Sequence, residues 1–152
     1  MRVHLVRHAK AGQRAAWEGD DRVRPLTKNG WRQAEAIADH LAARGASVLL
    51  TSPYLRCRQT LEPLARLLDV VIVDDDRLEE GRPFGPVIEL LATIGDGAVL
   101  CSHGDVIPET LAALQRRGCE IRGPADWRKG TVWTIDRHDG ELTSARVWRP
   151  AE

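Results

Sequence analysis

The apolar residues of this chain fall into two patterns that alternate along the sequence. Short continuous apolar runs predict buried strands at residues 3–6, 48–51, 70–73 and 98–101. Apolar residues at helical spacing predict helices at about residues 27–45, 52–68, 86–93 and 106–116. Two closing strands, around 132–135 and 145–148, flank Asp139-Gly140, a dipeptide typical of a hairpin turn. The alternation predicts a three-layer α/β/α sandwich with a mostly parallel central sheet.

Residues that favour helix ends support these boundaries. Thr27 is expected to cap the first helix and Gly45 to end it. Ser52 is expected to cap the second helix, with Pro53 in its first turn. Arg56 then also lies in the first turn of that helix.

Two of the predicted strands end on residues that can do chemistry. The first strand runs into Arg7 and His8, and the fourth runs into Ser102-His103-Gly104. The carboxyl ends of parallel strands meet at one edge of a sheet, which is where such folds bind ligands. We therefore expect the two histidines and the arginine to converge there.

These residues suit a bound phosphate. The planar guanidinium groups of Arg7 and Arg56 match phosphate oxygens, and the start of the second helix adds free backbone N–H groups. A neutral His8 can attack phosphorus and form a phosphohistidine, while His103 hydrogen-bonds the charged oxygens. We expect neither a metal nor another cofactor, and the absence of a GxxxxGK[ST] loop disfavours a nucleotide triphosphate site.

Composition limits the class of protein. With 152 residues, 43% of them hydrophobic, residues 1–152 are expected to form one domain. Lys and Arg number 22, as do Asp and Glu, so the net charge of +0 favours neither a nucleic acid nor a membrane as partner. There is no apolar stretch of membrane-spanning length, which predicts a cytoplasmic location. The three cysteines show no paired spacing and are expected to be reduced thiols.

The remaining basic and histidine residues have less specific expectations. Residues 12–25 are polar and rich in Arg and Asp, and they predict a loop over the sheet edge. Lys10 and Arg14 either steer an anionic substrate there or are ordinary solvated charges. His4 alternates with buried strand positions and is expected to be a packing residue, and His40 is expected at the surface.

Four separated motifs carry a resemblance to a known family. They are Leu5-Val6-Arg7-His8, Pro25-Leu26-Thr27, Ser52-Pro53-Tyr54-Leu55-Arg56-Cys57 and Ser102-His103-Gly104. Their order and spacing resemble the histidine phosphatase superfamily, also called phosphoglycerate mutase-like, and the short chain is most similar to its SixA branch of phosphohistidine phosphatases. The resemblance implies His8 as phospho-acceptor and Arg7, Arg56 and His103 as the phosphate pocket. Ala9 stands where the family signature has glycine, and its small side chain is expected to be tolerated.

The proton donor is less clearly marked. Leu78-Glu79-Glu80 resembles the segment that carries the acidic glutamate of larger relatives, with Glu80 the better match, but the tryptophan-containing part that follows is missing. Glu80, Glu79 and no carboxylate at all therefore stay open as donors. An alkoxide leaving group needs an acid, whereas a phosphohistidine leaves as an imidazole, so a weak acid favours cleavage of P–N bonds.

Together these features predict a metal-independent phosphatase that works through a phosphohistidine on His8. The favoured substrate is a phosphohistidine-containing signalling protein, such as a histidine phosphotransfer domain, because the short segment between residues 73 and 98 leaves no lid over a small metabolite. The first alternative is a phosphomonoesterase or mutase that acts on a small phosphorylated metabolite. The second is a noncatalytic module that binds phosphoproteins.

Overall fold

A mixed seven-stranded sheet forms the centre of the computed structural model, which describes residues 1–151. The strand order is β3-β2-β4-β1-β6-β7-β5. The strands are β1 (Arg2–Arg7), β2 (Leu49–Thr51), β3 (Ile72–Asp74), β4 (Val99–Ser102), β5 (Glu120–Ile121), β6 (Val132–His138) and β7 (Glu141–Trp148).

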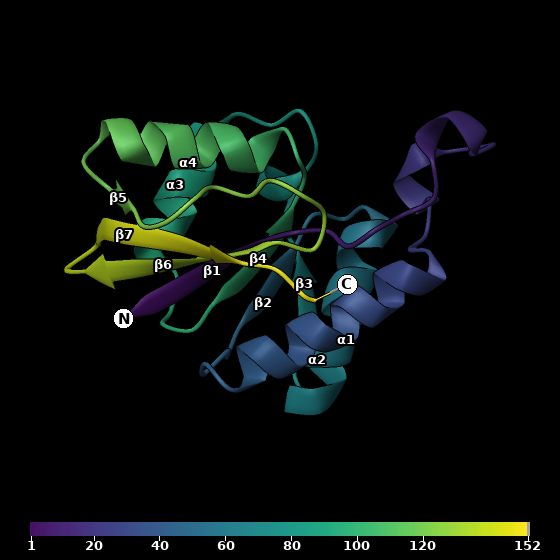
Figure 1. Ribbon diagram of the computed structural model, residues 1–152, viewed down its shortest axis with the longest axis horizontal. Coiled ribbons are helices and arrows are strands. Elements are labelled where there is room, and N and C mark those ends of the chain that lie inside the picture. The colour runs from purple at the N-terminus through teal and green to yellow at the C-terminus, as the bar shows by residue number, and fades with distance from the viewer. Residues whose placement is uncertain (152) are drawn as a thin grey trace.

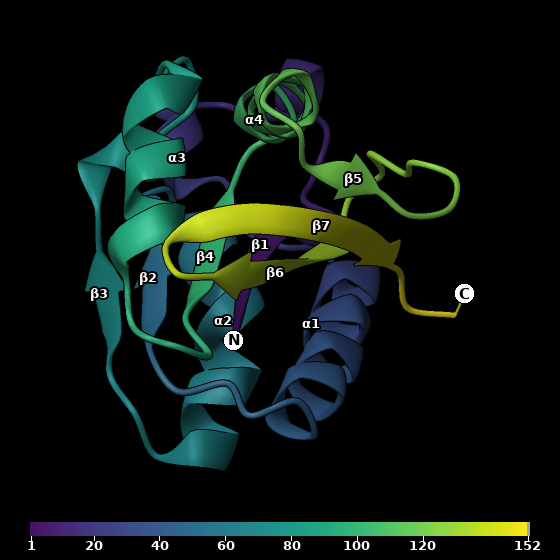
Figure 2. The same ribbon diagram turned by 90° about the vertical axis from the view of Figure 1, so that its left-hand side faces the viewer.

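Helices cover both faces of this sheet. They are α1 (Lys28–Ala42), α2 (Leu55–Leu68), α3 (Phe84–Thr93) and α4 (Val106–Arg116). Figure 1 shows α3 and α4 on one side of the strands and α1 and α2 on the other, and Figure 2 shows the sheet between them, from β3 at one edge to β5 at the other. The predicted three-layer α/β/α sandwich is confirmed. None of the helices in residues 1–151 is both long enough and apolar enough to cross a bilayer.

The register of the parallel strands aligns the two chemically marked strand ends. β1 pairs in parallel with β4, and Arg7 lies opposite Ser102. The backbone N–H of His8 then donates to the carbonyl of Ser102 at 3.1 Å. The residues that follow β1 and β4 therefore leave the sheet side by side.

Packing of the two helix layers follows the predicted apolar stripes. On one face, Ile37 and Leu41 of α1 pack in one cluster with Leu61 and Leu64 of α2, and all four are fully buried. Burying each such side chain stabilises the fold by about 1.5–3 kcal/mol. A second cluster joins α3 and α4 to the other face of the sheet around the fully buried Trp133. The site at the strand ends thus rests on two packed layers.

Several predicted local features are confirmed. The Thr27 side chain caps α1 by accepting a hydrogen bond from the Gly30 N–H at 3.0 Å. Asp139-Gly140 forms the turn between β6 and β7, with positive φ at both residues. The three cysteines are free and buried.

Other features differ from the prediction. The second helix begins at Leu55 with Tyr54 at its N-cap, not at Ser52, whose hydroxyl has another partner described below. The strand predicted at residues 70–73 is found at Ile72–Asp74 as the edge strand β3, where Val73 is 51% exposed. Val71 precedes that strand and is 80% exposed. The short strand β5 was not predicted, because two residues carry no periodicity. His40 is half-buried and stacked on Trp148, with ring centroids 3.7 Å apart.

Candidate active site

Two buried imidazoles meet where β1 and β4 end. His8 is 5% exposed and His103 is 1% exposed. Their ring centroids lie 5.5 Å apart and their planes are inclined by 65°. The convergence that the strand pattern predicted is therefore present.

His8 is held as a neutral ring with one nitrogen available. Its Nδ1 lies 2.8 Å from the carbonyl oxygen of Ala9. A carbonyl oxygen can only accept, so Nδ1 carries the proton and Nε2 keeps its lone pair. Burial lowers the pKa of His8 well below its ordinary value, and the charges of Arg56 and Arg7 add to this, although the hydrogen bond to Ala9 opposes it. His8 is therefore unprotonated at neutral pH, which is the form that can act as a nucleophile.

Arg7 depends on a glycine for its position. The Arg7 Nη1 donates to the carbonyl of Trp127. A Cβ atom on Gly104 would lie 2.5 Å from the Arg7 Cζ and 2.6 Å from its Nη2. The glycine that follows His103 thus leaves room for the guanidinium, which explains why a small residue stands there.

Arg56 projects from the first turn of α2 and is fully buried. Its Nη1 donates to the carbonyl of Asp21 at 2.9 Å, and its Nη2 to the Asp21 Oδ2 at 3.1 Å. Burial raises the pKa of Asp21, but the hydrogen bond from Arg24 and the charge of Arg56 outweigh it and bring this pKa below its usual value. The buried Arg56 guanidinium is thus paired with the Asp21 carboxylate of the 12–25 loop, and this pairing offsets the cost of burying its charge.

Thr60 connects the nucleophile to the helix that carries Arg56. Its Oγ1 accepts from the Ala9 N–H at 2.9 Å and donates to the Arg56 carbonyl at 2.7 Å. Ala9 itself is fully buried and has no positive φ, so alanine fits without backbone strain. This tie fixes the chain directly after His8 relative to α2.

His103 offers one ring nitrogen to the site. Its Nε2 lies 2.8 Å from the Ser52 Oγ, and that oxygen also accepts from the Tyr54 N–H at 3.3 Å. When the Ser52 hydroxyl donates to Nε2, the ring proton of a neutral His103 resides on Nδ1. That Nδ1 is buried and has no hydrogen-bond partner within the described residues.

Unpartnered buried nitrogens concentrate in this group of side chains. The Arg7 Nε, the Arg56 Nε and the His103 Nδ1 are buried and have no hydrogen-bond partner among residues 1–151. Buried donors without acceptors are uncommon in folded proteins and call for an explanation. An anion bound among these side chains is the simplest one.

The two candidate glutamates differ in their surroundings. Glu79 is 5% exposed, and its carboxylate is held by Arg22 and Arg82, the latter at 2.8 Å. Glu80 is more exposed; its Oε1 lies 2.6 Å from the Arg14 Nη2 and 3.7 Å from the Arg56 Nη2. Of the two, only Glu80 reaches the arginine of the pocket.

The sequence of the chain matches one protein family over more than half its length. Residues 3–87 match the histidine phosphatase superfamily, branch 1. The chain belongs to the histidine phosphatase superfamily. The family resemblance that the four motifs carried is thereby confirmed.

Two relatives with different activities resemble this chain over most of its length. An 8-oxo-(d)GTP phosphatase from Mycolicibacterium smegmatis is 36% identical over 99% of this chain and 48% of its own length. The phosphohistidine phosphatase SixA from Escherichia coli K12 is 38% identical over 75% of this chain and 74% of its own length. The chain therefore spans about half of the mycolicibacterial relative and most of SixA.

Solved histidine phosphatases share the fold. The protein histidine phosphatase SixA in complex with tungstate superimposes with a TM-score of 0.74 over 99% of this chain and 95% of that structure, at 21% identity. The phosphoglycerate mutase-like fold predicted from the sequence is confirmed.

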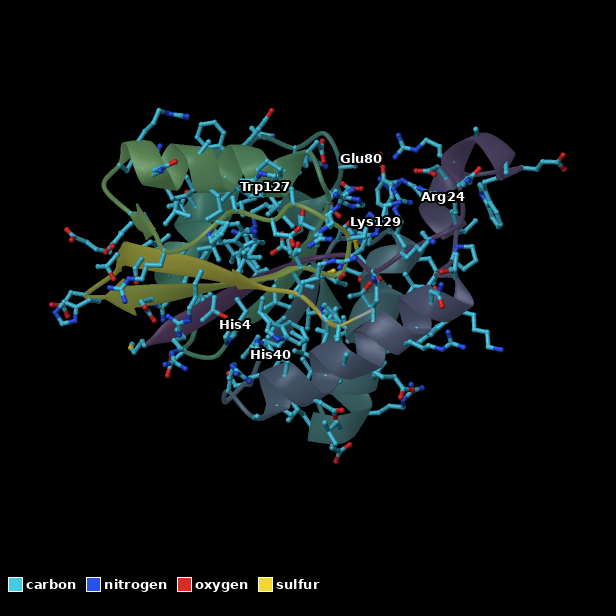
Figure 3. All side chains as sticks on the ribbon, in the orientation of Figure 1. His4, Arg24, His40, Glu80, Trp127 and Lys129 are labelled. Carbon is cyan, nitrogen blue, oxygen red and sulfur yellow. The ribbon has the colours of Figure 1, made fainter. Side chains whose placement is uncertain are left out.

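The structure brings together the four residues that the sequence predicted for a phosphate pocket, with Glu80 beside Arg56. Arg14 pairs with Glu80, and Lys10 lines a neighbouring cavity. Figure 3 shows Glu80 and Lys129 toward the end of the molecule where Arg24 of the 12–25 loop lies, whereas His4 lies away from that end.

Sequence reasoning missed three neighbours of the site. Asp21 pairs with Arg56, Ser52 contacts His103, and Lys129 lies near Arg7. Asp21 lies in a single 3-10 turn, Asp21–Val23, and Lys129 in the segment before β6, and neither segment is long enough to carry a periodic pattern. The run of four Arg and Asp residues at 20–24 was the one signal that a charged group belongs over the pocket.

Proposed function

We propose that this chain is a phosphatase that works through a phosphohistidine intermediate on His8. The observation that carries the proposal is the neutral, buried His8 ring, whose Nε2 lone pair stands among Arg7, Arg56 and His103. A module that only binds phosphate needs cations, but it does not need an unprotonated imidazole. The arrangement thus favours catalysis over binding alone.

In the first step, the Nε2 lone pair of His8 attacks phosphorus and the bond from phosphorus to the leaving group breaks. Arg7 and Arg56 balance the negative charge of the transferring oxygens, and the His103 Nδ1–H donates to one of them. In the second step, water attacks the phosphorus on His8, the P–N bond breaks, and orthophosphate and the free imidazole are released. The proton that water loses leaves with phosphate or solvent.

We propose a phosphohistidine on a protein as the first substrate. SixA of Escherichia coli, which is 38% identical, is named as a phosphohistidine phosphatase. Between β3 and β4 the described chain forms only a short 3-10 turn and α3, so this segment contributes no lid domain over the site. Glu80 is engaged by Arg14, and an imidazole leaving group does not depend on an acid at that position.

A second candidate substrate is a small phosphorylated molecule. One observation favours it: a basic cavity of 670 Å³ adjoins Arg7, and its volume is typical of small-molecule sites. The Mycolicibacterium smegmatis relative is named as a phosphatase of a nucleotide. Under this candidate, Glu80 is the proton donor to an alkoxide, so Glu80→Gln lowers kcat for phosphate esters and spares phosphohistidine.

The test is to trap the intermediate. The chain is mixed with a histidine phosphotransfer protein carrying radiolabelled phosphate and quenched in alkali, where phosphohistidine survives. We expect an acid-labile label on His8, absent in His8→Ala and retained in His138→Ala, a matched control at an exposed histidine. A chain that turns over without labelled His8 would contradict the mechanism. A His8→Ala variant that binds the phosphoprotein while the native chain releases no phosphate would establish the binding module instead.

A further inference from the structure

The cavity beside the phosphate pocket has an unusual charge. Six of the ten residues that line it are Arg or Lys, and none of the ten is acidic. The whole chain has a net charge of +0, so this excess is local. Arg7 belongs both to this wall and to the predicted phosphate pocket, so the cavity adjoins that pocket at Arg7.

Several of these cations have no carboxylate to neutralise them. Within residues 1–151, Lys10, Arg32 and Lys129 form no ion pair, whereas Arg128 pairs with Asp126 at 2.6 Å. Elsewhere on the surface, Arg58 pairs with Asp74 and Arg77 pairs with Asp75. The unneutralised charge is thus concentrated in one hollow.

Lys129 links the cavity to the catalytic arginines. Burial lowers the pKa of its ammonium group, and the charges of Arg7, Arg24, Lys10 and Arg56 lower it further. All four neighbouring charges that act on it are positive. A cluster of this kind repels itself, and a bound anion relieves that repulsion.

The polar neutral residues of the wall also favour an anion. The Asn29 Oδ1 accepts from the Arg32 Nη1 at 2.8 Å, and the Gln33 Oε1 accepts from the Lys10 backbone N–H at 2.9 Å. Both amide oxygens are therefore used within the protein, and the amide NH₂ groups remain as donors. The wall consequently offers donors and positive charge, with few free acceptors.

We propose that this cavity is a subsite for a chain of linked phosphates, so that the enzyme removes the terminal phosphate of a small molecule bearing two or more of them. The proposal rests on the phosphohistidine mechanism proposed above and specifies its second candidate substrate, a small phosphorylated molecule. The terminal phosphate lies at His8 and Arg7, and the next phosphates lie against Lys10, Arg32 and Lys129. A concave wall suits a compact oligophosphate better than the convex face of an acidic protein.

Cleavage of a linked phosphate does not require Glu80 as a proton donor. The His8 Nε2 attacks the terminal phosphorus, the P–O bond to the next phosphate breaks, and the shortened chain leaves as a phosphate anion. Such an anion is stable near neutral pH and needs no proton donor, just as an imidazole leaving group does not. Water then releases orthophosphate from His8.

The test compares inorganic tripolyphosphate with orthophosphate, using the full chain and a chelator to exclude metal. Calorimetry is expected to show tripolyphosphate binding roughly tenfold or more tightly. Lys10→Gln/Arg32→Gln is expected to weaken tripolyphosphate at least about tenfold and orthophosphate less than about threefold. The control Lys28→Gln/Arg66→Gln removes the same charge at exposed positions outside the cavity and should change neither affinity.

Three outcomes overturn the proposal. In the first, the double variant weakens binding of both anions equally. In the second, the control weakens tripolyphosphate binding as much as the double variant does. In the third, the double variant weakens binding of an acidic phosphoprotein and leaves tripolyphosphate binding unchanged. The proposed function fails separately: if His8 is never phosphorylated but tripolyphosphate affinity depends on Lys10 and Arg32, the subsite stands without it. If His8 is phosphorylated and the double variant has no effect, the function stands without the subsite.

Discussion

Replacing Gly104 by alanine should damage catalysis while leaving the fold nearly intact. The new Cβ would lie 2.5 Å from the Arg7 Cζ, whereas ordinary contacts begin at 3.4 Å, so the guanidinium must move by about 0.9 Å. A misplacement of about 1 Å in a catalytic group can cost about 100-fold in rate, which corresponds to about 2.7 kcal/mol. Gly104 has no positive φ, so the backbone accepts alanine, and the group that moves is the end of a flexible side chain.

The assay is kcat on a phosphohistidine peptide together with urea unfolding. We expect kcat to fall about 10- to 100-fold and the free energy of unfolding to change by less than about 1 kcal/mol. In an Arg7→Ala background the same substitution should have no further effect, because the group that it displaces is gone. Gly12→Ala serves as control, since no atom lies within 4 Å of the Cβ it would add. Retention of kcat within twofold, or an equal loss in the Arg7→Ala background, would refute the reasoning.

Three further predictions concern stability and the ties around the site. His4 is buried with a pKa of about 4, against 6.5 in the unfolded chain, so the unfolded state binds more protons below pH 6.5. His4 should contribute about 2 kcal/mol to the unfolding free energy lost between about pH 7 and pH 5, beside His8 and His40, whose pKa values are also lowered. His4→Gln should reduce the slope by that share in urea titrations. Gly30→Ala would place a Cβ 2.0 Å from the Lys10 carbonyl oxygen, a backbone atom, and should lower the melting temperature although alanine favours helices; an unchanged melting temperature would contradict the packing. Thr60→Val leaves the buried Ala9 N–H without an acceptor and should cost about 1–3 kcal/mol of stability with a fall in kcat, whereas a loss of stability with full kcat would show that the tie does not position His8.

The core of the site could be predicted because it depends on strand order and strand ends. Arg7 and His103 follow two apolar runs, and parallel pairing brings the ends of such runs to one edge of the sheet. Arg56 was placed in the first turn of a helix, where it is found, even though that helix begins three residues later than expected. Periodicity and motif spacing are therefore sufficient for residues attached directly to regular elements.

The rest depends on contacts that local patterns do not encode. Serine is a common helix N-cap, and the sequence therefore predicts Ser52 as a cap. In the structure its hydroxyl instead hydrogen-bonds His103, which is distant in sequence. Lys129 reaches Arg7 only because β6 pairs antiparallel with β1, which brings the Gly130 N–H to the Arg7 carbonyl at 3.2 Å. Val73 belongs to an apolar β-branched run that looks the same at a sheet edge as in the interior.

The contact between Asp21 and Arg56 has a consequence for turnover. Because Arg56 already pairs with the Asp21 carboxylate, an incoming phosphate must displace that carboxylate. The net free energy of phosphate binding is therefore the difference between the Arg56–phosphate and Arg56–Asp21 interactions. Every departing orthophosphate can be replaced at once by a group tethered to the same chain. Under the proposed mechanism, the loop of residues 12–25 competes with orthophosphate for Arg56, which weakens product binding and speeds product release.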